Sequence, residues 1–161
     1  MEFELIRVDE NDKNVIYNLM QLYTYELSFF EDETASFKML DSGLYVVSKY
    51  VERYWQEENR HPYLLKCNGE IAGFVLQRFT EENINEIAEF FVLNKYRKMG
   101  AGTFMANKMF ELYKGKWEVR TLMKNERAQK FWRNTIKKFT NDNFEEKYIR
   151  DNSRLAFYFE S

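Results

Sequence analysis

The chain has 161 residues with 45% hydrophobic and 18% aromatic content, which is typical of a single globular domain over residues 1–161 and excludes a disordered or low-complexity chain. Its net charge of −2 and the absence of a long apolar run argue against nucleic-acid and membrane partners. The single cysteine, Cys67, and an N-terminus without the pattern of a signal peptide predict a cytoplasmic protein.

The chain is expected to begin with a strand and a helix. Residues 3–8 alternate as in a half-buried strand, and Asp12 is predicted to cap a helix whose apolar side chains recur every three or four residues. The apolar stripe of that helix is Val15, Ile16, Leu19, Tyr23 and Leu27. Residues 29–43 then include the acidic run Glu31-Asp32-Glu33, and a second helix is expected to follow Ser48.

The clearest local prediction is a β-hairpin. Two β-rich runs, residues 63–66 and 71–77, flank Asn68-Gly69, the dipeptide typical of a type I′ turn. His61, the only histidine, stands at the edge of the first run, where a structural role is the simpler interpretation. The next run, residues 86–93, is apolar and aromatic and has the length of a strand.

A turn that contains glycine follows that strand. Residues 94–103 separate it from an apolar stripe that predicts a helix ending at Gly115. Two glycines permit a tight turn, a helix N-terminus offers unpaired N–H groups, and Arg97 and Lys98 add positive charge, so the turn suits a phosphate group. The spacing excludes a Walker A loop, and it excludes the dinucleotide-binding fingerprint because Met105 stands where a third glycine is required.

The C-terminal part is expected to add a strand, a helix and a hairpin. Residues 117–122 form the strand, and Asn125 is predicted to cap the helix. The apolar stripe of this helix is Ala128, Phe131, Trp132, Thr135, Ile136 and Phe139. Residues 144–149 and 154–159 predict the closing hairpin.

Two motifs together resemble the GNAT superfamily of acetyl-CoA-dependent acyltransferases. Residues 97–102 have the pattern Arg-x-x-Gly-x-Gly, which is similar to the pyrophosphate loop between the fourth strand and the following helix of that family. Asn125 and Ala128 match the Asn-x-x-Ala that the family carries after its next strand. The resemblance covers about residues 64–139, and it departs from the family at Trp132, where the family has a tyrosine.

The resemblance implies an α/β fold of the α+β type, with a mixed, mostly antiparallel twisted sheet of about six to seven strands and helices on both faces. It also implies that acetyl-CoA is the acetyl donor and that no metal takes part. A backbone N–H near Val92 is expected to polarise the thioester carbonyl. The positions that match the cofactor site of the family are Phe91, Val92, Leu93, Arg97, Lys98, Met99, Gly100, Ala101, Gly102, Thr103, Asn125, Ala128, Phe131 and Trp132.

Two glutamates of the expected fourth strand are candidates for the general base. An alkylamine has a pKa near 10.4 and must lose a proton before it attacks. Glu86 lies six residues before Val92, the offset of the catalytic glutamate in some family members, and Glu89 lies three before it. In a regular strand Glu86 shares a face with Val92 and Glu89 points the other way, whereas a bulge reverses that assignment. We expect Glu86 to be the base, with Glu89 as the alternative; Trp132 cannot protonate the leaving thiolate as a tyrosine can.

The acceptor is expected to be a primary amine of a small molecule or a peptide, acetylated by direct transfer. Glu26 and the acidic residues 31–33 would suit a cationic amine, and the resemblance places Tyr25, Glu26 and Phe29 near the acceptor. Two other functions stay open at this point. One is an acyl-CoA sensor of the same fold without turnover, and the other is a protein-interaction domain whose glycines are structural. The residues alone predict neither the amine nor the oligomeric state.

Overall fold

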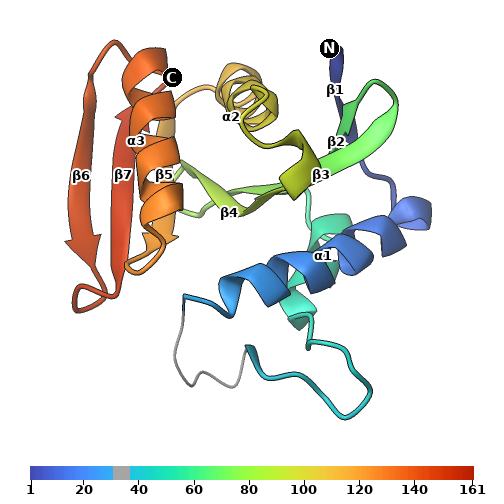
Figure 1. Ribbon diagram of the computed structural model, residues 1–161. Coiled ribbons are helices and arrows are strands. Elements are labelled where there is room, and N and C mark those ends of the chain that lie inside the picture. The colour runs from blue at the N-terminus through green and yellow to red at the C-terminus, as the bar shows by residue number, and fades with distance from the viewer. Residues whose placement is uncertain (31–36) are drawn as a thin grey trace.

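The computed structural model describes residues 1–30 and 37–161, and its centre is a seven-stranded sheet in the order β1-β2-β3-β4-β5-β7-β6 (Figure 1). Neighbouring strands are antiparallel except for β4 and β5, which are parallel. The expected mixed, mostly antiparallel sheet is therefore confirmed. The strands are β1 (Phe3–Arg7), β2 (Arg60–Cys67), β3 (Glu70–Phe79), β4 (Ile84–Val92), β5 (Lys116–Leu122), β6 (Phe144–Ile149) and β7 (Arg154–Glu160).

Helices cover both faces of the sheet (Figure 1). On one face lie α1 (Asn14–Leu27) and the 3₁₀ helix η3 (Lys49–Trp55), and on the other lie α2 (Ala101–Leu112) and α3 (Glu126–Phe139). In the described part of the chain, no helix combines the length and apolar character that a membrane crossing needs. Side chains with at most 1% exposure fill the two cores: Ile16, Val51, Phe74 and Leu76 on the α1 side, and Leu65, Val75, Met105, Phe110, Trp117 and Phe157 on the α2 side.

The predicted turn is confirmed, whereas the predicted helix starts lack side-chain caps. Asn68 and Gly69 have φ values of 49° and 81°, so the type I′ hairpin between β2 and β3 is confirmed. The predicted cap at Asp12 is wrong, because Asp12 lies in a 3₁₀ turn before α1 and makes no side-chain cap. Ser48 occupies the N-cap position of η3, as the expected second helix implies, but its side chain makes no capping hydrogen bond. Packing of the apolar face of α1 against the sheet stabilises that helix without a cap.

Strand β4 changes its partners halfway along its length. Residues 84–87 pair with residues 116–119 of β5, whereas the second half of β4 pairs only with β3. One extra residue, Ala88, stands in β4 between the pairs Leu76–Glu89 and Gln77–Ile87. This residue is a β-bulge, which bends the strand and ends its pairing with β5.

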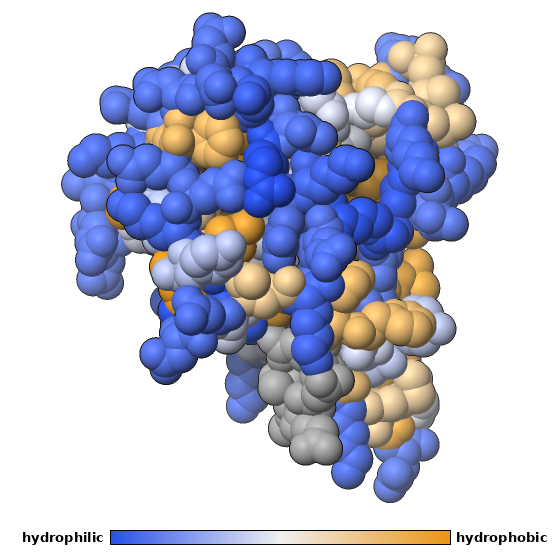
Figure 2. Space-filling model, turned by 60° about the vertical axis from the view of Figure 1, so that its left-hand side comes forward, coloured by the Kyte–Doolittle hydropathy of each residue, from blue (hydrophilic) through white to orange (hydrophobic). Residues whose placement is uncertain are grey.

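The edge strand β6 lies on a polar side of the molecule. Its side chains Glu145, Glu146 and Lys147 are exposed. The side that carries β6, brought forward in Figure 2, is mainly hydrophilic. Charged side chains on an edge strand disfavour pairing with the edges of other chains.

Candidate active site

A cleft of about 610 Å³ opens where β4 separates from β5. Its walls are the second half of β4, the loop before α2, the first turns of α2 and α3, and the C-terminal half of α1. Most of the positions that match the family's cofactor site line this cleft: Phe91, Val92, Arg97, Lys98, Gly100, Gly102, Thr103, Asn125, Ala128, Phe131 and Trp132. Three such positions lie outside the lining: Leu93, Met99 and Ala101.

The cleft also contains residues that the sequence does not assign to the cofactor. They are Tyr23, Glu26, Leu27, Phe90, Asn94 and Arg127. Tyr23 and Leu27 belong to the apolar stripe of α1, and helical spacing alone does not distinguish a core position from the wall of a cleft. The contact between α1 and the loop before α2 spans more than 70 residues of sequence, because Glu26 and Arg97 are 71 positions apart.

The loop before α2 and the first turn of that helix present backbone groups suited to a phosphate group. Lys98 and Gly100 have positive φ values of 60° and 89°, so the chain turns sharply just before α2 begins. A Cβ atom at Gly102 would lie 3.2 Å from the ring of Phe131, which is closer than ordinary contact. The first N–H groups of α2 have no acceptor inside the helix and carry the positive end of its dipole. These features fit the pyrophosphate of acetyl-CoA.

Helix α3 contributes a cap and an aromatic wall. The side-chain oxygen of Asn125 accepts a hydrogen bond from the N–H of Ala128 at 3.0 Å, so the predicted cap is confirmed. Trp132 is 4% exposed, and its ring centroid lies 4.7 Å from that of Phe90 and 4.9 Å from that of Phe131. The indole is therefore a packed part of the wall.

One carboxylate of α1 neutralises arginines on two other walls of the cleft. Glu26 forms ion pairs with Arg97 of the loop and with Arg127 of α3. Its neighbours Tyr25 and Phe29, which were expected near the acceptor, are 56% and 71% exposed and contact each other. The acidic residues 31–33 lie outside the described part of the chain.

Backbone hydrogen bonds place the N–H of Val92 on the open edge of β4. The N–H of Leu93 donates to the carbonyl oxygen of Ala72 at 2.8 Å, so the backbone of Leu93 faces β3. Successive residues of a strand present their backbone groups to opposite edges, and the carbonyl oxygen of Val92 accordingly accepts from Nε of Arg97 at 2.7 Å. The N–H of Val92 therefore points away from β3, toward the cleft.

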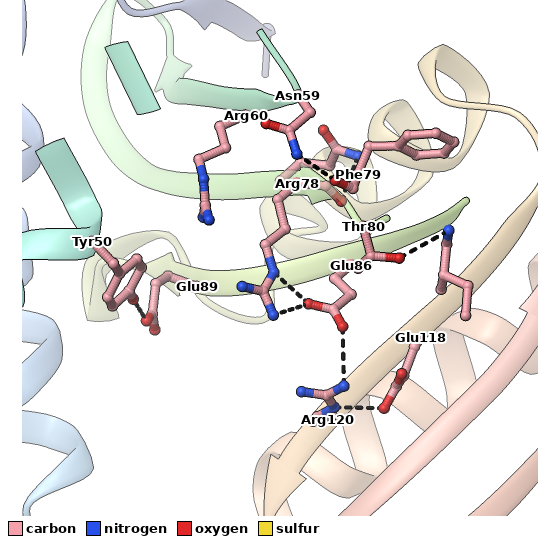
Figure 3. A network of polar contacts seen from close by, with 12 residues as sticks. Tyr50, Asn59, Arg60, Arg78, Phe79, Thr80, Glu86, Glu89, Glu118 and Arg120 are labelled. Atoms are coloured by element: carbon pink, nitrogen blue, oxygen red, sulfur yellow. Dashed lines mark hydrogen bonds and ion pairs between the residues drawn. The ribbon is translucent and has the colours of Figure 1, made fainter. Parts of the chain in front are cut away.

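A second cavity, of about 330 Å³, lies on the face of β4 that is turned toward α1 and η3. Within it, Glu86 is fixed by two arginines: Nε of Arg78 donates to it at 2.5 Å and Nη2 of Arg120 at 3.0 Å. Arg120 also donates to Glu118 at 2.5 Å, and Figure 3 shows these groups as one chain of contacts from β3 to β5. The carboxylate of Glu86 is thus held in an ion-pair network.

Glu89 lies in the same cavity but outside that network (Figure 3). The hydroxyl of Tyr50 donates a hydrogen bond to it. Removal from water raises the pKa of Glu89 to about 7, and a hydrogen bond from Tyr23 opposes that rise. Burial and the neighbouring charge of Glu89 in turn raise the pKa of Tyr23 well above its usual value. Because Tyr23 lines the cleft and Glu89 lines the second cavity, the two side chains connect these spaces.

The bulge at Ala88 decides how the two glutamates are oriented. Glu86 and Glu89 both line the second cavity, whereas Phe90 and Val92 pack with the core under α2. The expectation for a regular strand, with Glu86 on the face of Val92, is therefore wrong. The expected reversal by a bulge is also wrong, because the bulge lies between the glutamates and puts both of them on the face opposite Val92.

Comparisons with known proteins agree with this arrangement. The family described as "Acetyltransferase (GNAT) family" matches residues 19–135. A GNAT-family acetyltransferase from Staphylococcus aureus has a similar structure, with a TM-score of 0.66, 14% identity and 99% of each chain covered. A Bacillus anthracis protein named as a streptothricin acetyltransferase, solved with acetyl coenzyme A, has a TM-score of 0.61 and 16% identity, with 100% of this chain and 99% of that chain covered.

A further similar structure is the ribosomal-protein-S18-alanine N-acetyltransferase of Escherichia coli. Its TM-score is 0.65 at 12% identity, with 99% of this chain and 94% of that chain covered. No curated protein sequence matches the chain. The structural similarities establish the fold, and the family match spans most of the chain, from α1 to α3. The chain therefore belongs to the GNAT family of acetyltransferases.

Proposed function

We propose that the protein transfers an acetyl group from acetyl-CoA directly to a primary amine. One observation carries this proposal: Tyr23 and Glu89 connect a cleft that fits the cofactor with a second cavity on the other side of β4. In direct transfer, donor and acceptor must meet at one point, and a group that accepts a proton must lie beside that point. The bent strand β4 meets both requirements, because it borders the cleft and the second cavity and carries Glu89.

The cofactor would lie against the cleft residues through backbone as well as side-chain groups. The loop at residues 98–100 and the first turn of α2 would hold its pyrophosphate. The open edge of β4 would pair with its peptide-like arm, because backbone pairing does not depend on side-chain identity. When bound, acetyl-CoA supplies the acetyl group as a thioester, and the N–H of Val92 points to the side where a donor to the carbonyl oxygen is needed.

Among the two glutamates, the geometry favours Glu89 as the base. Glu86 is paired with Arg78 and Arg120, whereas the partners of Glu89 among the described residues are the phenols of Tyr50 and Tyr23. A carboxylate with a pKa of about 7 can take a proton from an ammonium group near neutral pH and return it to water. In the reaction the amide C–N bond forms and the C–S bond breaks. The nitrogen loses two protons, one through Glu89 and the other to the thiolate or to water. A thiol with a pKa near 8.5 can leave as an anion, so Trp132 need not supply an acid.

Two measurements test the proposed function. Acetyl-CoA should raise the melting temperature of the protein, and a panel of primary amines should then release free thiol in its presence. A stabilised protein that releases no thiol with any amine would favour the alternative of an acyl-CoA sensor. A protein that acetyl-CoA does not stabilise would contradict both.

Tyr23→Phe should move the pH dependence of the reaction. The hydrogen bond from Tyr23 lowers the pKa of Glu89, so its removal raises that pKa further. Because a base works only when deprotonated, kcat/KM falls below about pH 7 in the natural protein, and in the variant this fall begins at a higher pH. Rates from about pH 5.5 to about pH 9 would show the shift. Tyr25→Phe, an exposed change on the same helix, is the control, and an identical profile for all three proteins would exclude Glu89 as the base.

Glu26→Gln should strengthen the binding of acetyl-CoA. The carboxylate of Glu26 competes with the phosphate groups of the cofactor for Arg97 and Arg127. Its negative charge also repels those phosphate groups. We expect an affinity about three- to tenfold higher by calorimetry, which corresponds to roughly 0.7–1.4 kcal/mol. Glu146→Gln, which removes the ion pair between Glu146 of β6 and Arg133 of α3, is the matched control. Weaker binding in Glu26→Gln would mean instead that Glu26 positions the two arginines for the cofactor.

A further inference from the structure

The second cavity is lined by arginines and glutamates in equal number. It is lined by three arginines (Arg78, Arg120, Arg150) and three glutamates (Glu86, Glu89, Glu118). Glu86 and Glu118 are paired with Arg78 and Arg120, and Glu118 also accepts from the hydroxyl of Tyr158 at 3.2 Å. Glu89 is partly neutral near pH 7 because its pKa is about 7. Among the described residues, one arginine of this lining has no carboxylate partner.

That arginine is Arg150. This residue is exposed, lies in the turn between β6 and β7, and has a φ of 52°. In the described part of the chain its guanidinium forms no ion pair or hydrogen bond, unlike those of Arg78 and Arg120, although its carbonyl oxygen accepts from the N–H of Ser153 at 3.0 Å. A guanidinium on the wall of a cavity is well suited to bind a carboxylate through two parallel hydrogen bonds.

The volume of the cavity suggests a compact acceptor. Water occupies about 30 Å³ per molecule in the liquid, so about 330 Å³ corresponds to roughly eleven water molecules. A single amino acid fits such a space, whereas a polyamine would bring several positive charges to a wall that already carries arginines.

We infer that the second cavity is the acceptor site and that the acceptor is an amino-acid-like molecule with a carboxylate as well as its amine. The amine lies at Glu89, and the carboxylate lies at Arg150. This inference rests on the proposed function, because an acceptor is required only if the protein transfers an acetyl group. It replaces the expectation of a purely cationic amine with a zwitterion.

The test compares amino acids with the amines formed by their decarboxylation, such as phenylalanine with phenethylamine and lysine with cadaverine. The amide of each amino acid has nearly the same size as the amino acid but lacks the carboxylate charge, so it distinguishes an effect of charge from an effect of size. Thiol release in the presence of acetyl-CoA should give kcat/KM at least tenfold higher for an amino acid than for its amide or its decarboxylated amine. Equal or better use of the decarboxylated amines would overturn the inference and leave the proposed function intact.

Arg150→Asn tests the binding residue, because asparagine tolerates the positive φ at this position. It should raise KM for the preferred amino acid at least tenfold, leave kinetics with decarboxylated amines unchanged, and leave the affinity for acetyl-CoA unchanged. Arg150→Lys should recover part of the loss, and Lys138→Gln, which removes an exposed charge on α3, should have no effect. An equal loss with both kinds of amine would overturn the role of Arg150.

A direct binding measurement covers the case in which no amine releases thiol. Calorimetry with the protein saturated by coenzyme A should then detect the amino acid and not its decarboxylated amine. That result would support the acceptor class while contradicting turnover. Equal binding of both compounds, or of neither, would overturn the inference.

Discussion

Replacement of Glu89 by Gln should lower kcat by about 10²–10⁴-fold while the affinity for acetyl-CoA stays unchanged. Glutamine has nearly the same shape and can still accept the hydrogen bond from Tyr50, but it cannot take a proton. The loss should appear in kcat with a confirmed acceptor, and calorimetry should show equal cofactor binding. The acidic limb of the pH profile should disappear together with the rate, because the titrating group has been removed.

Glu86→Gln is the matched control, since it changes the same side chain on the same face of β4. Its carboxylate is 8% exposed and pairs with Arg78 and Arg120, so its loss should lower the melting temperature by several degrees. The rate per folded molecule should stay within a few-fold of the natural protein. A large fall in kcat for Glu86→Gln together with a normal rate for Glu89→Gln would reverse the two roles.

Gly102→Val should weaken acetyl-CoA binding by ten- to a hundredfold. A Cβ at this position already meets the Phe131 ring at 3.2 Å and a methyl group of Val92 at 3.7 Å, so the branched side chain would occupy the space between α2 and β4. Calorimetry with acetyl-CoA would measure the loss, and Gly102→Ala should give an intermediate affinity.

A control separates this effect from damage to the helix. Lys108→Val places the same β-branched side chain on the exposed side of α2 and should leave the affinity unchanged. Circular dichroism should show similar helix content in all of these proteins. If Gly102→Val binds acetyl-CoA as well as the natural protein, the loop before α2 does not hold the cofactor.

Local rules predicted the fold well where the sequence pattern and the packing agree. Asn68-Gly69 adopts the turn that its dipeptide favours, and Trp132, Thr135 and Ile136 of the α3 stripe are buried as the spacing predicts. The capping rule failed at Asp12 because packing, rather than a side-chain cap, stabilises the start of α1. The loop motifs predicted much of the cleft lining, since the Arg-x-x-Gly-x-Gly turn and Asn125 themselves line the cleft.

The sequence did not reveal the contacts that join distant parts of the chain. Tyr23 has the spacing of a core residue, and only the fold shows that it lies beside Glu89 and on the wall of the cleft. Arg150 stands in a polar turn, where an exposed arginine is ordinary, until the turn is seen to border the second cavity. Such proximities depend on the order of strands in the sheet, which no local pattern contains.

The extra residue at Ala88 has a consequence for how relatives of this chain should be aligned. Counting six positions back from Val92 leads to Glu86, and this count includes the one residue by which β4 exceeds its partner β3. Against a relative whose fourth strand has no bulge, an alignment with no gap at Ala88 would match residues from opposite faces of the strand and would transfer the role of a glutamate to the wrong position. For the same reason, deleting Ala88 should be far more harmful than replacing it, because deletion turns the first half of β4 over relative to the second.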